Sequence, residues 1–153
     1  MLVVPALRLT AFGGFALASA DGTLGAAAGQ RRPLAVLALL AAAGEAGMSR
    51  EKILGLLWPD ADPERGRRTL TQTLYSLRRA TGADELFLGV TDLRLNPAAV
   101  ECDVLAFDAA LRQGRLADAV ALYRGPFLDG FQVPGAEEFE RWAEGERLRY
   151  AHQ

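Results

Sequence analysis

The chemistry of this sequence is concentrated in one cationic segment, RGRRTLTQTLYSLRRA, at residues 65–80. It carries five arginines and no carboxylate, although the 153-residue chain has a formal charge of −2. Guanidinium groups bind phosphate, and Gln, Thr, Ser and Tyr side chains contact base edges and phosphate oxygens. A solvated helix usually mixes charges of both signs so that neighbouring turns pair. Since these cations have no local partner, the segment indicates either a strongly solvated face or a nucleic-acid interface.

The residues around this segment predict a helix over residues 63–80. Asp62 is a favoured N-cap, and Pro63 suits the first helical position. Gly82 follows the segment at a position where helices commonly end. The cationic side chains are therefore expected on a helix with defined ends.

At about 100° per residue, this helix sorts its side chains into two faces. The apolar face, which we expect to pack against a core, consists of Leu70, Leu74 and Leu77. The opposite face consists of Arg65, Arg68, Gln72, Tyr75, Ser76 and Arg79. Between the faces lie Arg67, Thr71 and Arg78 on one flank and Thr69 on the other. We predict that the polar members of these sets contact DNA.

The position of each polar side chain predicts which part of a duplex it would reach. Gln72 can pair with the N6 and N7 atoms of adenine, and Arg68 or Arg79 with O6 and N7 of guanine. The flanking Arg67 and Arg78 are expected at phosphates, which supply affinity without sequence information.

The start of the chain predicts a small antiparallel β-sheet. Residues 6–11 and 14–19 read as short strands with alternating apolar and polar positions. Asp21 and Gly22 mark a turn, and TLG, at residues 23–25, suggests a third strand.

Two further helices and a hairpin frame the cationic helix. RRPLAVLALLAAA has helical periodicity, and REKILGLLW follows Ser49, a good N-cap. ELFLGVTDLRLNP, after the cationic helix, reads as a hairpin. In it, Arg94 is either an exposed strand charge or a contact to an adjacent minor groove. The order of sheet, three helices and hairpin is typical of a winged helix-turn-helix, whose third helix enters the major groove.

The composition changes after Pro97 and predicts a second unit. Residues 1–100 have a net charge of +2 and residues 101–153 a net charge of −4. Two short helices split at Gly114 and a third near the end of the chain are expected, as in a helical repeat array. We therefore predict domains at residues 1–97 and 98–153, the second being the first part of a longer array.

Residues suited to catalysis, metal binding or a cofactor site are scarce. Cys102 is the single cysteine, which excludes an intramolecular disulfide and fits a reducing cytoplasm. His152 is the single histidine and has no evident acid–base partner. DADPERG spaces its carboxylates like a calcium loop, but Pro63 starts a helix there. We expect no metal, no cofactor and no enzymatic activity.

No segment predicts a membrane protein. The N-terminal apolar run ends in ALASA, which is similar to a signal-peptidase site, but Arg8 follows an apolar stretch instead of preceding one. No stretch reaches the ~20 apolar residues of a membrane span. A cytoplasmic protein without membrane contact is expected.

Several motifs in one order resemble a known family: LRLTAFGGFAL, RRPLAVLALLA, SREKILGLLWPDADPERGRRTLTQTLYSLRRA, CDVLAFDAAL, AVALYRGPFLDGF and EEFERWAEGERLR. The sequence resembles the SARP-type antibiotic regulatory proteins of bacteria. These are transcriptional activators with an OmpR-type winged helix followed by a bacterial transcriptional activator domain. The resemblance implies a mainly α-helical fold with small antiparallel sheets, a DNA-binding first domain and a tetratricopeptide-like second one.

The resemblance also implies partners for particular residues. The third helix would read promoter DNA, with protomers in tandem on direct repeats. The loop before it would contact RNA polymerase through Pro59, Asp60, Ala61 and Asp62. The chain departs from the family at Gly66, where alanine is usual, and at Thr69, where asparagine is common. Its hairpin also lacks the family's glycine–tyrosine pair.

The sequence therefore predicts a sequence-specific DNA-binding transcriptional activator. The alternative is a protein-interaction module of a larger regulator, in which the helical half binds a partner and the winged helix has little DNA affinity.

Overall fold

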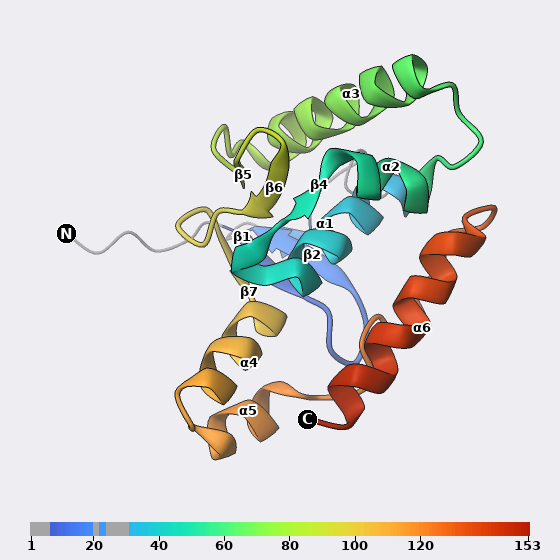
Figure 1. Cartoon of the computed structure of the whole chain (residues 1–153). Helices are drawn as coiled ribbons and strands as arrows, with labels where there is room; N and C mark the ends of the chain where they lie inside the picture. Colours follow the sequence, from blue (N-terminus) through green and yellow to red (C-terminus); the bar gives the residue numbers. More distant parts are fainter. Residues whose placement is uncertain (1–6, 20–21, 24–30) are drawn as a thin grey trace.

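The computed structural model describes residues 7–19, 22–23 and 31–153. These residues form six α-helices, a short 3-10 helix and two small β-sheets (Figure 1). The first half contains β1 (Leu7–Thr10), β2 (Ala16–Ser19), β3 (Gly22–Thr23), α1 (Arg31–Ala43), η1 (Gly44–Ala46), β4 (Met48–Ser49), α2 (Arg50–Leu57) and α3 (Pro63–Thr81). The second half contains β5 (Phe87–Leu88), β6 (Asp92–Leu95), β7 (Val100–Cys102), α4 (Asp103–Arg112), α5 (Leu116–Leu122) and α6 (Glu137–Ala151).

The N-terminal sheet has the strand order β3-β2-β1-β7. β1 and β2 pair antiparallel, with Leu9 opposite Leu17, as the alternating pattern predicts. β7 pairs with β1 in the parallel direction, with Leu7 opposite Val100. The prediction of purely antiparallel sheets is wrong at this pair. A parallel neighbour arrives through a long crossover and leaves no local signal in the sequence.

Part of the predicted N-terminal sheet lies outside the described residues. β3 covers Gly22 and Thr23, whereas Asp21 of the predicted turn and the rest of TLG fall outside. The apolar run before Leu7 also falls outside.

The three predicted helices before the hairpin all form, and two of them have the predicted N-caps. The Ser49 hydroxyl accepts a hydrogen bond from the Lys52 N–H at 3.1 Å, which caps α2. The Asp62 carboxylate accepts one from the Arg65 N–H at 3.4 Å, which caps α3. Gly82 ends α3 in the left-handed conformation, with φ of 71°.

The predicted hairpin forms from β5 and β6, with Leu88 opposite Arg94. It is joined by β4, where Met48 pairs with Leu93, so the sheet order is β4-β6-β5. The sequence did not predict β4, because two residues are too short for an alternating pattern to be recognised.

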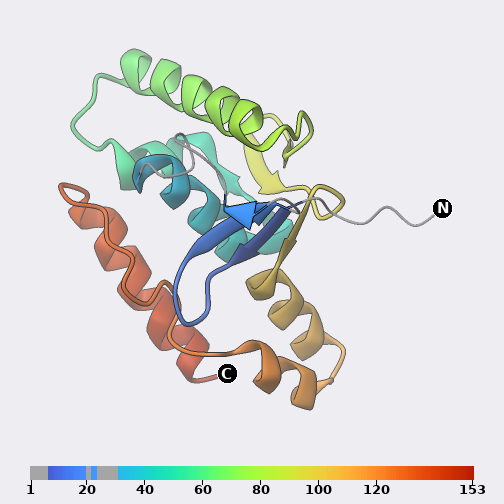
Figure 2. The ribbon, with the colours of Figure 1, turned by 180° about the vertical axis from the view of Figure 1, so that it is seen from behind.

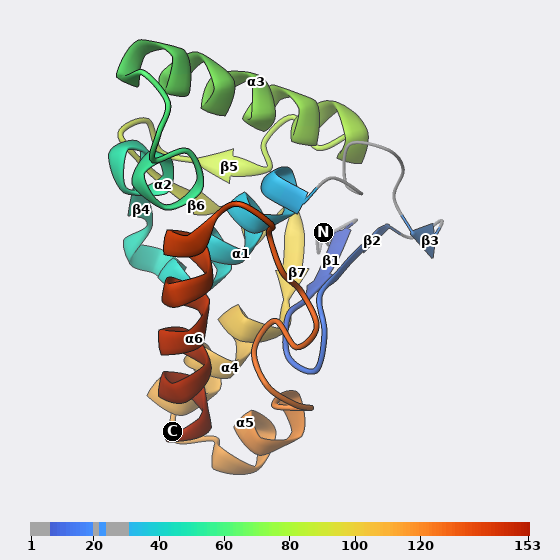
Figure 3. The same ribbon diagram turned by 90° about the vertical axis from the view of Figure 1, so that its right-hand side faces the viewer.

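The helical segment begins as predicted and then departs from a stacked array. α4 and α5 pack on each other and are joined through Gly114, with φ of 72°. α6 instead lies against α2 of the first half (Figure 3). The connection between α5 and α6 spans residues 123–136, long enough to carry α6 back to the first half.

That connection folds over the turn between β1 and β2 (Figure 2). The Gly13 N–H donates to the Pro126 carbonyl at 3.0 Å, and the Leu128 N–H donates to the Ala11 carbonyl at 2.8 Å. A Cβ at Gly125 would lie 2.9 Å from the Gly13 Cα, so the backbones approach too closely for a side chain. Two distant segments are thereby joined as closely as neighbouring strands.

One continuous hydrophobic core joins the two predicted domains. The ring of Phe12 lies 5.2 Å from that of Phe107 in α4 and 5.2 Å from that of Tyr150 in α6, measured between centroids. Phe127, in the connection before α6, lies 5.2 Å from Tyr150. The domain boundary after residue 97 stays a prediction, and the segments on its two sides pack together.

Asp103, at the first position of α4, ties this helix to the end of β1. Its carboxylate accepts hydrogen bonds from the Ala11 N–H at 2.9 Å and from the Phe12 N–H at 3.0 Å. Burial raises the pKa of Asp103, and the backbone hydrogen bonds from Phe12 and Ala11 oppose that rise. The carboxylate therefore satisfies two backbone donors beside the core.

We predict that Asp103→Ala lowers the free energy of unfolding by about 1–3 kcal/mol, because the Ala11 and Phe12 N–H groups lose their acceptor. Urea unfolding of the full chain, followed by circular dichroism, measures the change. Asp118→Ala is the control: its exposed ion pair with Arg115 makes a change below about 1 kcal/mol the expected result. Equal effects of the two substitutions would contradict a role for Asp103 in joining the halves.

Candidate nucleic-acid interface

α3 forms the outermost layer at one end of the molecule, with α2 and the hairpin beneath it (Figure 1). Its buried stripe consists of Gly66, Leu70, Leu74 and Leu77, as the helical spacing predicts. Because this stripe holds one side of the helix to the core, the opposite side faces solvent along most of its length.

Most of the side chains predicted to contact DNA lie together on the solvent side of α3. The exposed ones are Arg65, Arg67, Arg68, Thr71, Gln72, Tyr75, Ser76 and Arg79. Thr69 and Arg78 are half-buried at the edges of this face. We call this set of residues the α3 polar face. It contains no carboxylate, and its positive charge lies in two clusters, Arg65, Arg67 and Arg68 near the start of the helix and Arg78 and Arg79 near its end.

The prediction that these cations have no local partner concerns the segment itself, and Arg67 finds a partner outside it. Its Nε lies 3.3 Å from Glu51 Oε1, a carboxylate that α2 brings alongside α3. The two side chains are 58% and 70% exposed, so solvent screens the pair and its contribution to stability is small. Among the described residues, Arg65 and Arg68 form neither an ion pair nor a side-chain hydrogen bond.

Two further arginines lie against aromatic rings. The Arg79 Nη1 donates to the Tyr75 hydroxyl at 3.4 Å, and its guanidinium lies 5.9 Å from the centre of that ring. The Arg78 guanidinium lies 5.5 Å from the ring of Phe87 in β5. These contacts orient the guanidinium groups without neutralising their charge.

The hydroxyl of Thr69 is already engaged within the helix. It donates to the Arg65 carbonyl at 2.9 Å, and Thr73 makes the same contact with the Thr69 carbonyl at 2.8 Å. Such i to i−4 bonds leave the oxygen as an acceptor only. Thr69 is therefore less suited to phosphate, which needs a donor, than the exposed Thr71.

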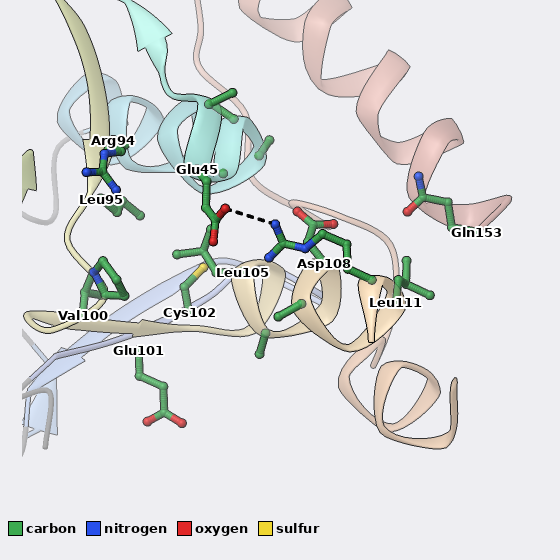
Figure 4. Close-up of a pocket in the computed structure, with 18 of the residues that line it drawn as sticks. Glu45, Arg94, Leu95, Val100, Glu101, Cys102, Leu105, Asp108, Leu111 and Gln153 are labelled. Carbon is green, nitrogen blue, oxygen red and sulfur yellow. Dashed lines mark ion pairs between the residues drawn. The ribbon is translucent and has the colours of Figure 1, made fainter. Parts of the chain in front are cut away.

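Arg94 lies apart from the α3 polar face. Its side chain extends from β6 and, like that of Glu45, lines a groove next to α4 (Figure 4). Strand alternation puts Leu93 and Leu95 in the core and turns Arg94 the other way. The predicted minor-groove contact of Arg94 stays a prediction.

Sequence reasoning missed Arg50, which holds the tip of the hairpin. Its Nε donates to the Val90 carbonyl at 2.7 Å, and its backbone N–H donates to the Thr91 carbonyl at 3.1 Å. A Cβ at Gly89 would collide with the Asp92 carbonyl, so the turn requires glycine there. The turn is thus held against the start of α2, and the only sequence signal was an arginine next to the N-cap Ser49.

The loop between α2 and α3, predicted to contact RNA polymerase, is short and mostly exposed. Pro59, Asp60 and Asp62 are exposed, and Ala61 is half-buried. The Ala61 N–H donates to the Trp58 carbonyl at 3.2 Å. Because Asp62 also caps α3, the loop and the α3 polar face are held in a defined relation.

In the described part of the chain, no three His, Cys, Asp or Glu side chains lie close enough to hold a metal ion. No helix there combines the length and the apolar character needed to cross a membrane.

We predict that Gly66→Ala stabilises α3. A Cβ at this position would lie 3.4 Å from Leu54 Cδ2 and 3.8 Å from Ala61 Cβ, which are ordinary packing distances. Alanine favours a helix interior over glycine by about 1 kcal/mol, so a gain of up to that size in unfolding free energy is expected.

Gly82→Ala is the matched control, because Gly82 ends the same helix with φ of 71°. The same urea titration should show a loss of about 1 kcal/mol for this variant. A loss of stability in Gly66→Ala would contradict the prediction, because it would mean that the Leu54 side chain cannot move to make room for the added methyl group.

Comparison with known proteins finds a likeness in fold. The structure of Mycobacterium tuberculosis EmbR in complex with a low-affinity phosphopeptide matches with a TM-score of 0.64 and 21% sequence identity. The match covers 97% of this chain and 44% of the EmbR chain, so this chain spans less than half of that protein's length. No family model and no curated protein sequence matches the chain. At this identity the likeness concerns the fold alone.

Proposed function

We propose that this chain is a DNA-binding transcriptional regulator of the activator type. In this proposal α1, α2, α3 and the β5–β6 hairpin act as a winged helix-turn-helix, and α3 enters the major groove. The observation that carries the proposal is the α3 polar face, where Arg65 and Arg68 are exposed without an acidic partner among the described residues. Phosphate would supply the missing counter-charge.

The arrangement of the polar face supports a division of roles along α3. Gln72 and Arg68, on the exposed side, are proposed to read base edges. The flanking Arg67 and Arg78 are proposed to meet phosphates, and so is Arg65 in the first turn of the helix. The pairing of Arg79 with Tyr75 supports a joint contact by these two side chains.

The loop residues Pro59, Asp60, Ala61 and Asp62 are proposed to contact RNA polymerase. These residues directly precede the first turn of α3 and are mostly exposed beside the α3 polar face, which supports this role. The resemblance to SARP-type regulators supports tandem protomers on direct repeats of a promoter, in a bacterial cytoplasm. The likeness to EmbR spans both halves of the chain, which supports treating them as one unit.

A second candidate function is a protein-interaction module. The observation that favours it is the exposed apolar pair Leu116 and Val120 on α5, at 63% and 73% exposure. Salt-sensitive DNA binding distinguishes the two functions, because a protein partner of this apolar pair would respond weakly to salt.

We predict that the full chain binds a DNA fragment selected from random sequence, with an affinity that falls steeply as salt rises. Each phosphate contact contributes about one to the slope of log affinity against log salt, so Arg65→Ala should flatten that slope by about one. Arg115→Ala, at the junction of α4 and α5, should leave the slope unchanged. Fluorescence anisotropy at several salt concentrations measures both variants. The absence of any salt-sensitive binding would favour the interaction module.

We predict that Gln72→Ala weakens binding to the selected site by about 1–3 kcal/mol and to random DNA by less, because a base contact is lost. Arg65→Ala serves as the comparison, since losing a phosphate contact should weaken both complexes equally. Competition titrations with the two DNAs give the ratio of the affinity for the selected site to the affinity for random DNA. Equal losses for Gln72→Ala on both DNAs would exclude it as a base reader.

A further inference from the structure

A groove of about 890 Å³ lies where the two halves of the chain meet (Figure 4). Its walls come from the end of α1 with η1, from β6 and β7, from α4, and from Arg149 and Gln153 at the end of the chain. The volume lies within the range of sites that hold small molecules, and such sites occur preferentially where domains meet. Apart from Arg94, whose minor-groove contact stays a prediction, no residue predicted to contact DNA lines this groove.

The floor of the groove is apolar and uncharged. Leu95, Val100 and Cys102 are buried beneath it, and half-buried Leu105 and Leu111 of α4 with Ala42 and Ala43 of α1 form its apolar surface. Burial raises the pKa of the Cys102 thiol to about 12, so the thiol carries no charge at neutral pH. The floor therefore suits the apolar body of a ligand.

The rim of the groove carries guanidinium groups that are only weakly neutralised. Arg112 Nη1 pairs with Glu45 Oε2 at 3.3 Å, but the two side chains are 57% and 78% exposed. Such an exposed pair is worth little and can be exchanged for another carboxylate. Arg94 forms no ion pair among the described residues.

The lining holds three carboxylates, Glu45, Glu101 and Asp108, and three arginines, Arg94, Arg112 and Arg149, so what decides the charge at the rim is where each group points. Glu101 pairs with Arg8 at 3.3 Å and points to the far side of β7 (Figure 4). Asp108 lines the groove and is half-buried; burial raises its pKa, and the charges of Arg149 and Arg112 oppose that rise, so these arginines also have a carboxylate near them. A ligand that reaches the rim therefore meets an unpaired guanidinium at Arg94 and an exchangeable one at Arg112.

We propose that this groove binds a small amphipathic anion, a carboxylate with an apolar body. The body lies over Leu105, Leu111 and Ala43, and the carboxylate takes the place of Glu45 at Arg112. Planar guanidinium groups match the geometry of a carboxylate, which favours this head group over a neutral one. The ligand would contact both α1 and α4, so it would bridge the two halves of the chain.

The test uses the full chain with 2-naphthoate as the probe and its neutral amide, 2-naphthamide, as the matched comparison. Isothermal titration calorimetry should show saturable binding of 2-naphthoate at one site, and about 10-fold weaker binding of the amide. Equal binding of both compounds would overturn the assignment of an anion. No saturable binding of 2-naphthoate would overturn the site.

Variants then locate the binding. Arg112→Gln should weaken 2-naphthoate binding about 10-fold, and Arg94→Gln by a smaller factor, because Arg94 adds only to the positive potential at the rim. Glu45→Gln should strengthen binding severalfold, because it frees Arg112 from its own carboxylate. Ala106→Trp, at an exposed position on the groove wall, should abolish binding by filling the space while the fold persists.

Arg68→Gln is the control, because it removes a charge from the α3 polar face instead of the groove. It should leave 2-naphthoate binding unchanged. A loss of 2-naphthoate affinity in Arg68→Gln would mean that the probe binds α3 and would overturn the groove as its site. If Ala106→Trp, with an unchanged circular dichroism spectrum, bound the probe as the wild-type chain does, the groove would not be the site. None of these outcomes depends on whether the chain binds DNA.

Discussion

The burial of Phe12 is the constraint on which the rest of the structure depends. This residue follows β1, near the start of the chain, yet its ring is covered by Phe107, Phe127 and Tyr150 from the second half. The Asp103 carboxylate and the connection between α5 and α6 satisfy the backbone of the same turn. Without the helical segment, the N-terminal sheet would expose the Phe12 ring to water, and the Ala11 and Phe12 N–H groups would lose their acceptor. The helical segment therefore supports the first half instead of being merely attached to it.

The candidate site inherits its geometry from this support. α6 packs on α2, and α2 carries α3 on its other side. Leu54 of α2 lies against Gly66 of α3. Arg50 of α2 donates a hydrogen bond to the Val90 carbonyl in the hairpin turn. The α3 polar face, the loop before it and the hairpin are consequently positioned by a single short helix. A surface that has to match a rigid duplex gains from such support, because little of it needs to be ordered on binding.

The arginines of the α3 polar face and those of the groove have acidic neighbours of a similar kind. In the groove, Arg149 pairs with Glu146 of its own helix. The pairs of Glu51 with Arg67 on α3 and of Glu45 with Arg112 in the groove are exposed. Water screens these pairs, so they orient the cations at low cost and yield to a better anion. The difference between the surfaces lies in what surrounds the charge. α3 is polar along its exposed side, which suits phosphate and base edges, whereas the groove has an apolar floor, which suits an organic carboxylate.

The sequence by itself determined the features that depend on neighbouring residues. The caps at Ser49, Asp62 and Gly82, the bounds of α3 and its division into buried and exposed faces all follow from spacing within one or two turns. Only the tertiary structure decided the parallel pairing of β7 with β1, the packing of α6 on α2, the partner of Arg67 and the direction of Arg94. These arrangements join residues far apart in the chain, and their free energy comes from burial and pairing that no local pattern records. The cationic helix could thus be read from its own residues, while the groove between the halves existed only once the chain had folded.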